Sequence, residues 1–134
     1  MNGIDLEVAT RMIAGAQEKA REIGVPMVIT IVDDGGNLKA MNRMDGALLG
    51  SIDISFGKAF TAVAFNNATE AIAPDVQPGQ PLYGLHVTNA GRIVIFGGGI
   101  PLRRGDVLVG AVGVSGGSVE EDVAVATGGA AAFE

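Results

Sequence analysis

Residues 27–42 read MVITIVDDGGNLKAMN. The first six form an unbroken run of apolar and β-branched side chains, which is typical of a central strand covered on both faces. Residues 33–37 are Asp, Gly and Asn, which suit a turn with positive φ, and residues 38–42 resume as a second strand. The pattern predicts a β-hairpin whose first strand lies inside a sheet.

Helical and extended patterns alternate on both sides of this hairpin. Apolar residues at three-to-four spacing predict a helix from Asp5, as its N-cap, to Gly24, as its left-handed stop. A helix rich in small residues is predicted at about 47–66, followed by an irregular loop at about 73–91. Two further strands are predicted at 92–96 and 107–115, with a tight glycine loop at 97–101 after the first. The last predicted element is a helix from a Ser118–Glu121 capping box to about 133. This order points to the α+β class with an antiparallel sheet, in a single domain over residues 1–134.

Composition excludes several classes of function. Of 134 residues, 48% are hydrophobic and only 18% are charged, which excludes a disordered chain and indicates that part of the surface is buried against other copies. With 15 acidic and 9 basic residues, the chain would be repelled by nucleic-acid phosphates. No apolar run is long enough for a membrane span, and no secretory signal opens the sequence, so we expect a cytoplasmic protein without a membrane partner.

Reactive side chains are scarce. Cysteine is absent, which excludes disulfides, thiolate catalysis and metal sites built on cysteine. The single histidine, His86, excludes a multi-histidine metal site within one subunit, and no hydrolytic triad or phosphate-binding loop is present. His86 is therefore the one imidazole that could ligate a haem iron or move a proton at neutral pH, although a lone loop histidine is more often a packing residue.

The stretch Arg43-Met44-Asp45-Gly46 joins a predicted strand to a predicted helix, a common location for a ligand site. Lys58 lies on the same helix among small and apolar residues, on one stripe with two serines. A buried cation needs an anionic partner, and Asp45 or Asp33 could supply it. Such a group is either a structural ion pair or an anion-binding or acid–base site, and the sequence favours the structural alternative only slightly.

Two glycine-rich segments could present backbone amides to an anion. Gly97, Gly98 and Gly99 precede a proline, and a tight turn is the simpler interpretation of this segment. Ser115 and Gly116 lead into the predicted capping box, where Glu121 and its acidic neighbours complement the helix dipole and would repel a phosphate.

Five segments together resemble the GlcG/HbpS-like family, which includes the C-terminal domain of PduO-type proteins. They are residues 26–37, 43–47, 58–62, 96–101 and 109–122, in order and over nearly the whole chain. The resemblance implies a profilin-like α/β/α sandwich with about five antiparallel strands, dimer-based homo-oligomers, and haem as a ligand candidate. The shared motif positions are Asp33, Arg43, Asp45, Lys58, Gly97, Gly98, Pro101, Ser115, Gly116 and Glu121.

Haem-binding relatives are thought to use histidine ligands near the beginning of the domain, and the first predicted helix here has none. A haem would need His86, Tyr83 or a methionine as its ligand, or would lie at a subunit interface without strong ligation.

Three functions follow from these observations. In the first, an oligomeric binding protein holds a haem or another carboxylate-bearing ligand between the long loop and the Arg43, Asp45 and Lys58 region, with help from the Gly97–Gly99 amides. In the second, an isomerase, tautomerase or lyase acts on a small carboxylated or carbonyl metabolite. Lys58 or Arg43 would stabilise an oxyanion, and Asp45, Glu121 or His86 would move a proton. In the third, the charges are architectural and the chain is an accessory module without a ligand.

Overall fold

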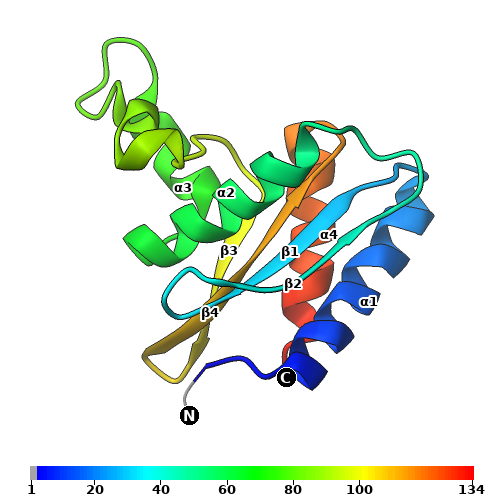
Figure 1. Cartoon of the computed structure of the whole chain (residues 1–134). Helices are drawn as coiled ribbons and strands as arrows, with labels where there is room; N and C mark the ends of the chain where they lie inside the picture. The colour runs from blue at the N-terminus through cyan, green and yellow to red at the C-terminus, as the bar shows by residue number, and fades with distance from the viewer. Residues whose placement is uncertain (1–2) are drawn as a thin grey trace.

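The computed structural model describes residues 3–134 and shows one antiparallel sheet between two layers of helices (Figure 1). The strands are β1 (Val28–Asp33), β2 (Leu38–Arg43), β3 (Gly99–Arg104) and β4 (Val107–Ser115), in the spatial order β2-β1-β4-β3. Helices α1 (Leu6–Ile23) and α4 (Val119–Ala131) cover one face, and α2 (Ser51–Phe65) covers the other. The predicted α/β/α sandwich is confirmed, with four strands rather than about five.

The predicted hairpin is present, and its first strand is central. β1 pairs with β2 on one side and with β4 on the other, and its first five residues are buried. The turn closes through Asp33, whose Oδ1 accepts hydrogen bonds from Gly35 N and Asn37 N, both at 2.9 Å. Gly36 has a φ of 77°, which glycine adopts without strain.

Both ends of α1 and the start of α4 lie where the sequence predicts them. Asp5 caps α1 by accepting a hydrogen bond from Val8 N at 2.8 Å, and Gly24 ends the helix in the left-handed conformation. The capping box at α4 has both of its bonds, because Ser118 Oγ accepts from Glu121 N and Glu121 Oε1 accepts from Ser118 N. Helix α2 begins at Ser51, later than predicted, because turns at Gly46 and Gly50 precede it.

Small residues let α2 lie almost directly on the sheet. A Cβ on Gly113 of β4 would lie 2.6 Å from Ala59 N and would also meet Ser55 O. Ser55, buried in the same interface, shares a 2.8 Å hydrogen bond with Thr30 of β1. Gly113 therefore allows the backbones of β4 and α2 to approach each other closely.

The connection from α2 to β3 departs from the prediction at one end. Helix α3 (Thr69–Ile72) and short 3₁₀ turns η1 (Ala73–Val76), η2 (Leu85–Val87) and η3 (Asn89–Gly91) interrupt the irregular loop. The predicted strand at 92–96 is wrong, because this segment packs on α2 and Val94 N donates to Thr61 Oγ1 at 3.0 Å. The edge strand β3 begins instead within the predicted glycine loop, and it tolerates Pro101 because an edge strand can spare an amide.

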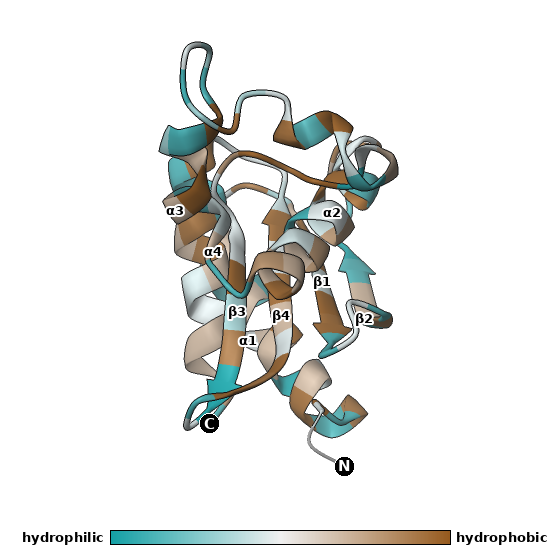
Figure 2. Ribbon diagram, turned by 90° about the vertical axis from the view of Figure 1, so that its left-hand side faces the viewer, coloured by the Kyte–Doolittle hydropathy of each residue, from teal (hydrophilic) through white to brown (hydrophobic). Residues whose placement is uncertain are grey.

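Apolar side chains concentrate on the central strands, as Figure 2 shows for β1 and β4. One cluster lies between the sheet and helices α1 and α4, and a smaller one lies under α2. Within residues 3–134, no helix has the length and apolarity needed to cross a membrane.

Candidate functional site

Lys58 is fully buried and completely engaged. Its Nζ donates to Asp122 Oδ2 at 2.9 Å and to Val114 O at 2.8 Å, and it lies 5.0 Å from the centre of the Phe96 ring. Asp122 is 3% exposed, and its second oxygen accepts from Gly117 N at 2.8 Å. The ion pair therefore joins α2 to the start of α4 across the end of β4.

The prediction that Asp33 or Asp45 pairs with Lys58 was wrong. Neither Asp33 nor Asp45 reaches it: Asp33 holds the hairpin turn, and the acid that pairs with Lys58 is Asp122. Burial lowers the pKa of Lys58, while the hydrogen bond and the charge of Asp122 act in the opposite direction. Since Lys58 has no exposed surface, a ligand could contact its ammonium only after residues packed around it, such as Phe96 or Asp122, move away.

The glycine segments are also occupied by internal contacts. Gly97, Gly98 and Gly99 are buried, and Gly99 N donates to Thr69 Oγ1 at 2.9 Å. A Cβ on Gly98 would lie 2.7 Å from Lys58 Nζ, so this glycine makes room for the ammonium. Gly98 and Gly99 thus pack against Lys58, and all three glycines are buried and not open to a ligand.

Residues around the start of α4 serve the same junction. Ser115 donates to Ser51 Oγ at 3.1 Å, and a Cβ on Gly116 would meet Pro26 O at 2.7 Å. Glu121 is engaged in the capping box. Lys58, Asp45 and Glu121, the trio considered for catalysis, do not line a common recess among the two best-formed pockets of residues 3–134.

Arg43 and Asp45 do lie at an open recess. It has a volume of about 330 Å³, and its lining also includes Gln17 and Arg21 of α1 and Met44. Both arginines are exposed, and within residues 3–134 the guanidinium group of neither one forms an ion pair or a hydrogen bond. We call this recess the α1–β2 pocket. Two guanidinium groups on different elements can bind one or two carboxylates with paired hydrogen bonds.

His86 lies away from both recesses, in η2 of the long loop. Its ring is half-buried and meets Tyr83 edge-on, with ring centres 5.9 Å apart. The buried nitrogen is Nδ1, which has no hydrogen-bond partner in the described structure, so the outer face of the ring presents Nε2. The long loop lies on the α2 side of the sheet, whereas α1 lies on the other side (Figure 1).

Two important residues escaped the sequence analysis. Asp122 matched a helix first turn, where an acid needs no further explanation, and only the fold reveals that it faces Lys58. The sequence places Arg21 on the solvent-exposed face of α1, where an arginine is ordinary. In the structure, Gln17, one turn earlier, accepts a 2.8 Å hydrogen bond from Asn42 Nδ2, so this face of α1 lies beside β2. No local pattern signals either pairing.

The fold and this pocket define a small α/β/α protein with a four-stranded antiparallel sheet and an arginine-lined recess. The chain belongs to the HbpS-like family, since the family model "Haem degrading protein HbpS-like" matches residues 4–131. The resemblance to the GlcG/HbpS-like family is thus confirmed.

Individual relatives support the assignment. A 15.0 kDa Citrobacter freundii protein from the dhaT–dhaS intergenic region is 51% identical, over 89% of this chain and 84% of that protein. The corrinoid adenosyltransferase PduO of Salmonella typhimurium is 45% identical over 91% of this chain. The matched region is only 35% of the length of PduO. The crystal structure of a PduOC–haem complex has a TM-score of 0.93 and 41% identity, and covers 97% of this chain and 94% of that one.

Proposed function

We propose that this protein binds a small carboxylate-bearing ligand in the α1–β2 pocket, and that haem is the first candidate. The observation that carries this proposal is the convergence of Arg21 and Arg43 on one open recess, without an acidic partner for either among residues 3–134. Similarity to a protein crystallised with haem supports the choice of ligand.

The chemistry of the pocket fits the propionate edge of a haem. Each guanidinium presents N–H groups in a planar fork that matches a carboxylate, and the two propionates of one haem would engage both arginines. Asp45, at the same recess, would accept a hydrogen bond from a donor group on the ligand or orient an arginine. A recess of about 330 Å³ holds only one edge of the macrocycle, so the remainder would lie outside it.

Met44 and His86 are the iron ligands that we propose to test first. Met44 lines the α1–β2 pocket and carries the soft thioether there. His86 belongs to η2 of the long loop, on the α2 side of the sheet, and we propose that it would reach the haem from a second copy of the chain. Leu48 and Leu49, shortly after Asp45, are 66% and 78% exposed, and a macrocycle or a second copy would cover them. We therefore propose that the binding unit is a homo-oligomer.

Hemin titration tests the placement. Wild-type protein should give a sharpened Soret band at defined stoichiometry. Arg21→Ala/Arg43→Ala should weaken hemin binding by about a hundredfold or more, since each of the two lost charge-assisted contacts contributes ~1.5–3 kcal/mol. Arg92→Ala, a matched control at an exposed arginine away from this pocket, should leave the titration unchanged. A wild-type spectrum identical to that of free hemin would reject haem as the ligand.

The same titration assigns the iron ligand. If His86 ligates, His86→Ala should shift or abolish the Soret band, and the mass of the hemin complex should exceed that of one chain. If Met44 ligates, Met44→Leu should change the band while His86→Ala leaves it intact.

A further inference from the structure

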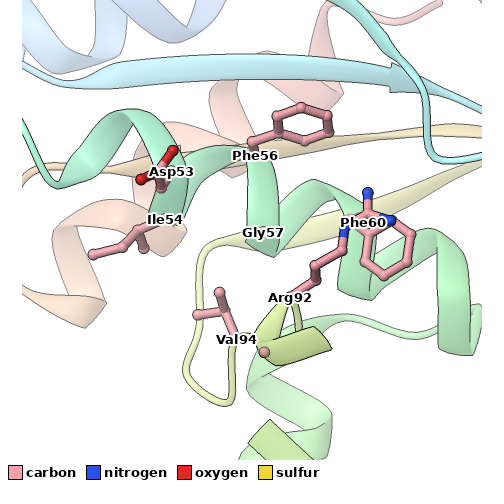
Figure 3. A pocket seen from close by; sticks show the side chains of 8 residues that line it. Asp53, Ile54, Phe56, Gly57, Phe60, Arg92 and Val94 are labelled. Carbon is pink, nitrogen blue, oxygen red and sulfur yellow. The ribbon is translucent and has the colours of Figure 1, made fainter. Parts of the chain in front are cut away.

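A second recess lies away from the α1–β2 pocket, between α2 and residues 91–94. It has a volume of about 400 Å³ (Figure 3). Its walls are mostly apolar or aromatic, and they include Ile54, Phe56, Phe60 and Val94. Asp53 and Arg92 are its two charged residues. We call it the α2 pocket.

The walls of the α2 pocket are fixed before any ligand arrives. Val94 N donates to Thr61 Oγ1 at 3.0 Å, and Thr61 in turn donates to Gly57 O at 2.7 Å. A Cβ on Gly57 would lie 2.7 Å from Val94 Cγ2 and 3.1 Å from Arg92 O. The absence of a side chain at Gly57 thus lets the 92–94 segment dock against α2 and form the floor of the recess.

Arg92 is held in a defined orientation by an aromatic ring. The centre of its guanidinium lies 3.6 Å from the centre of the Phe60 ring. Phe60 is itself packed on the β1–β2 turn, since a Cβ on Gly36 would lie 2.9 Å from its Cδ1. Stacking occupies the face of the guanidinium and leaves its N–H groups free in the plane, where a carboxylate binds.

Asp53 supplies the opposite charge at the other side of the recess. Figure 3 shows Asp53 and Arg92 on either side of Gly57, with Phe56 and Ile54 near Asp53 and Phe60 beside Arg92. Within residues 3–134, the side chains of Asp53 and Arg92 form no ion pair with each other or with another residue, and neither side chain makes a hydrogen bond. The recess therefore has a carboxylate without an ion-pair partner at one side, apolar walls in the middle, and an oriented guanidinium without an ion-pair partner at the other side.

We propose that the α2 pocket binds a small dipolar organic acid. The carboxylate of the ligand pairs with Arg92, an ammonium or hydroxyl group at its other end donates to Asp53, and an apolar or aromatic middle lies against Phe56 and Phe60. This site is separate from the one proposed for haem, and the pocket lining contains no histidine, tyrosine or methionine to ligate iron. A phosphate or other simple anion fits less well, because Asp53 would repel it and it would make no contact with the aromatic walls.

Calorimetry and NMR with para-(aminomethyl)benzoate test the proposal. Wild-type protein should bind this probe saturably, and at least about tenfold more tightly than benzoate or benzylamine, each of which lacks one charged end. Unbranched amino acids with one to five methylenes between their charged ends extend the test to other ligand lengths. Amide shifts should concentrate at residues 53–60 and 91–94.

Variants separate this site from the α1–β2 pocket. Arg92→Gln should lower affinity for the carboxylate end, and Asp53→Asn should lower affinity for the amino acids without lowering the affinity for benzoate. Arg43→Ala is the matched control and should have no effect here, whatever it does to hemin binding. Both target residues are exposed, so the variants should melt as wild type does.

Two results would overturn the proposal. One is the failure of every dipolar probe to saturate the wild-type protein at millimolar concentration. The other is binding that Asp53→Asn and Arg92→Gln both leave unchanged. Neither result would bear on hemin binding at the α1–β2 pocket, which is measured independently.

Discussion

Asp122→Asn should lower the free energy of unfolding by about 3–5 kcal/mol at neutral pH, the range for breaking one side of a buried ion pair. The substitution preserves shape and can still accept from Gly117 N, but it leaves the Lys58 ammonium buried without a counter-charge. Urea denaturation followed by circular dichroism measures the loss.

A double variant and a pH series show whether the unpaired charge is the cause. Lys58→Met/Asp122→Asn should recover most of the lost stability, because no buried charge remains. In Asp122→Asn, the carboxylate that raises the pKa of Lys58 is gone, so the folded-state pKa falls further below 10.5. The unfolded state then binds more protons between that lowered pKa and 10.5, and the stability of the variant should rise with pH across this window. A double variant as unstable as the single one would contradict a charge effect.

Gly113→Ala should destabilise the protein by about 3 kcal/mol, at the upper end for overpacking. The added Cβ would meet Ser55 O and lie 2.6 Å from Ala59 N, and both are backbone atoms of α2 that cannot rotate away. Relief requires α2 to move off the sheet, which also disturbs the Thr30–Ser55 hydrogen bond and the Lys58–Asp122 pair. Thermal and urea unfolding measure the effect.

Gly50→Ala is the matched control for this substitution. Gly50 has φ −61° and ψ −22°, and a Cβ there would meet nothing within 4 Å. Alanine should therefore change stability by less than about 1 kcal/mol, in the stabilising direction. Equal losses at positions 50 and 113 would show that close approach of α2 is not what glycine provides at 113.

Local sequence signals predict the elements whose stabilising contacts are also local. The hairpin turn depends on Asp33 bonding to residues two and four positions later, and the ends of α1 and α4 depend on caps three residues away. Burial on both faces also follows from the apolar run at 28–32.

The strand predicted at 92–96 shows where local reasoning stops. Ile93, Val94 and Ile95 have the composition of a strand, but composition reports burial against any surface. Here that surface is α2, and the edge strand of the sheet is β3, which contains Gly99 and Pro101 and follows this segment.

The candidate site was predictable only in part. Arg43 and Asp45 share a recess as the strand-to-helix junction suggests, whereas Lys58 is sealed by an acid 64 positions away in the sequence. The second arginine of the pocket comes from α1, and its approach to β2 depends on how the helix packs on the sheet.

The most direct test of the α1–β2 pocket compares hemin with its dimethyl ester, in which both propionates are neutral. Wild-type protein should bind the free acid at least about tenfold more tightly than the ester, and Arg21→Ala/Arg43→Ala should bind the two forms equally. Equal affinity of the wild-type protein for acid and ester would contradict the claim that these arginines hold the carboxylates of the ligand.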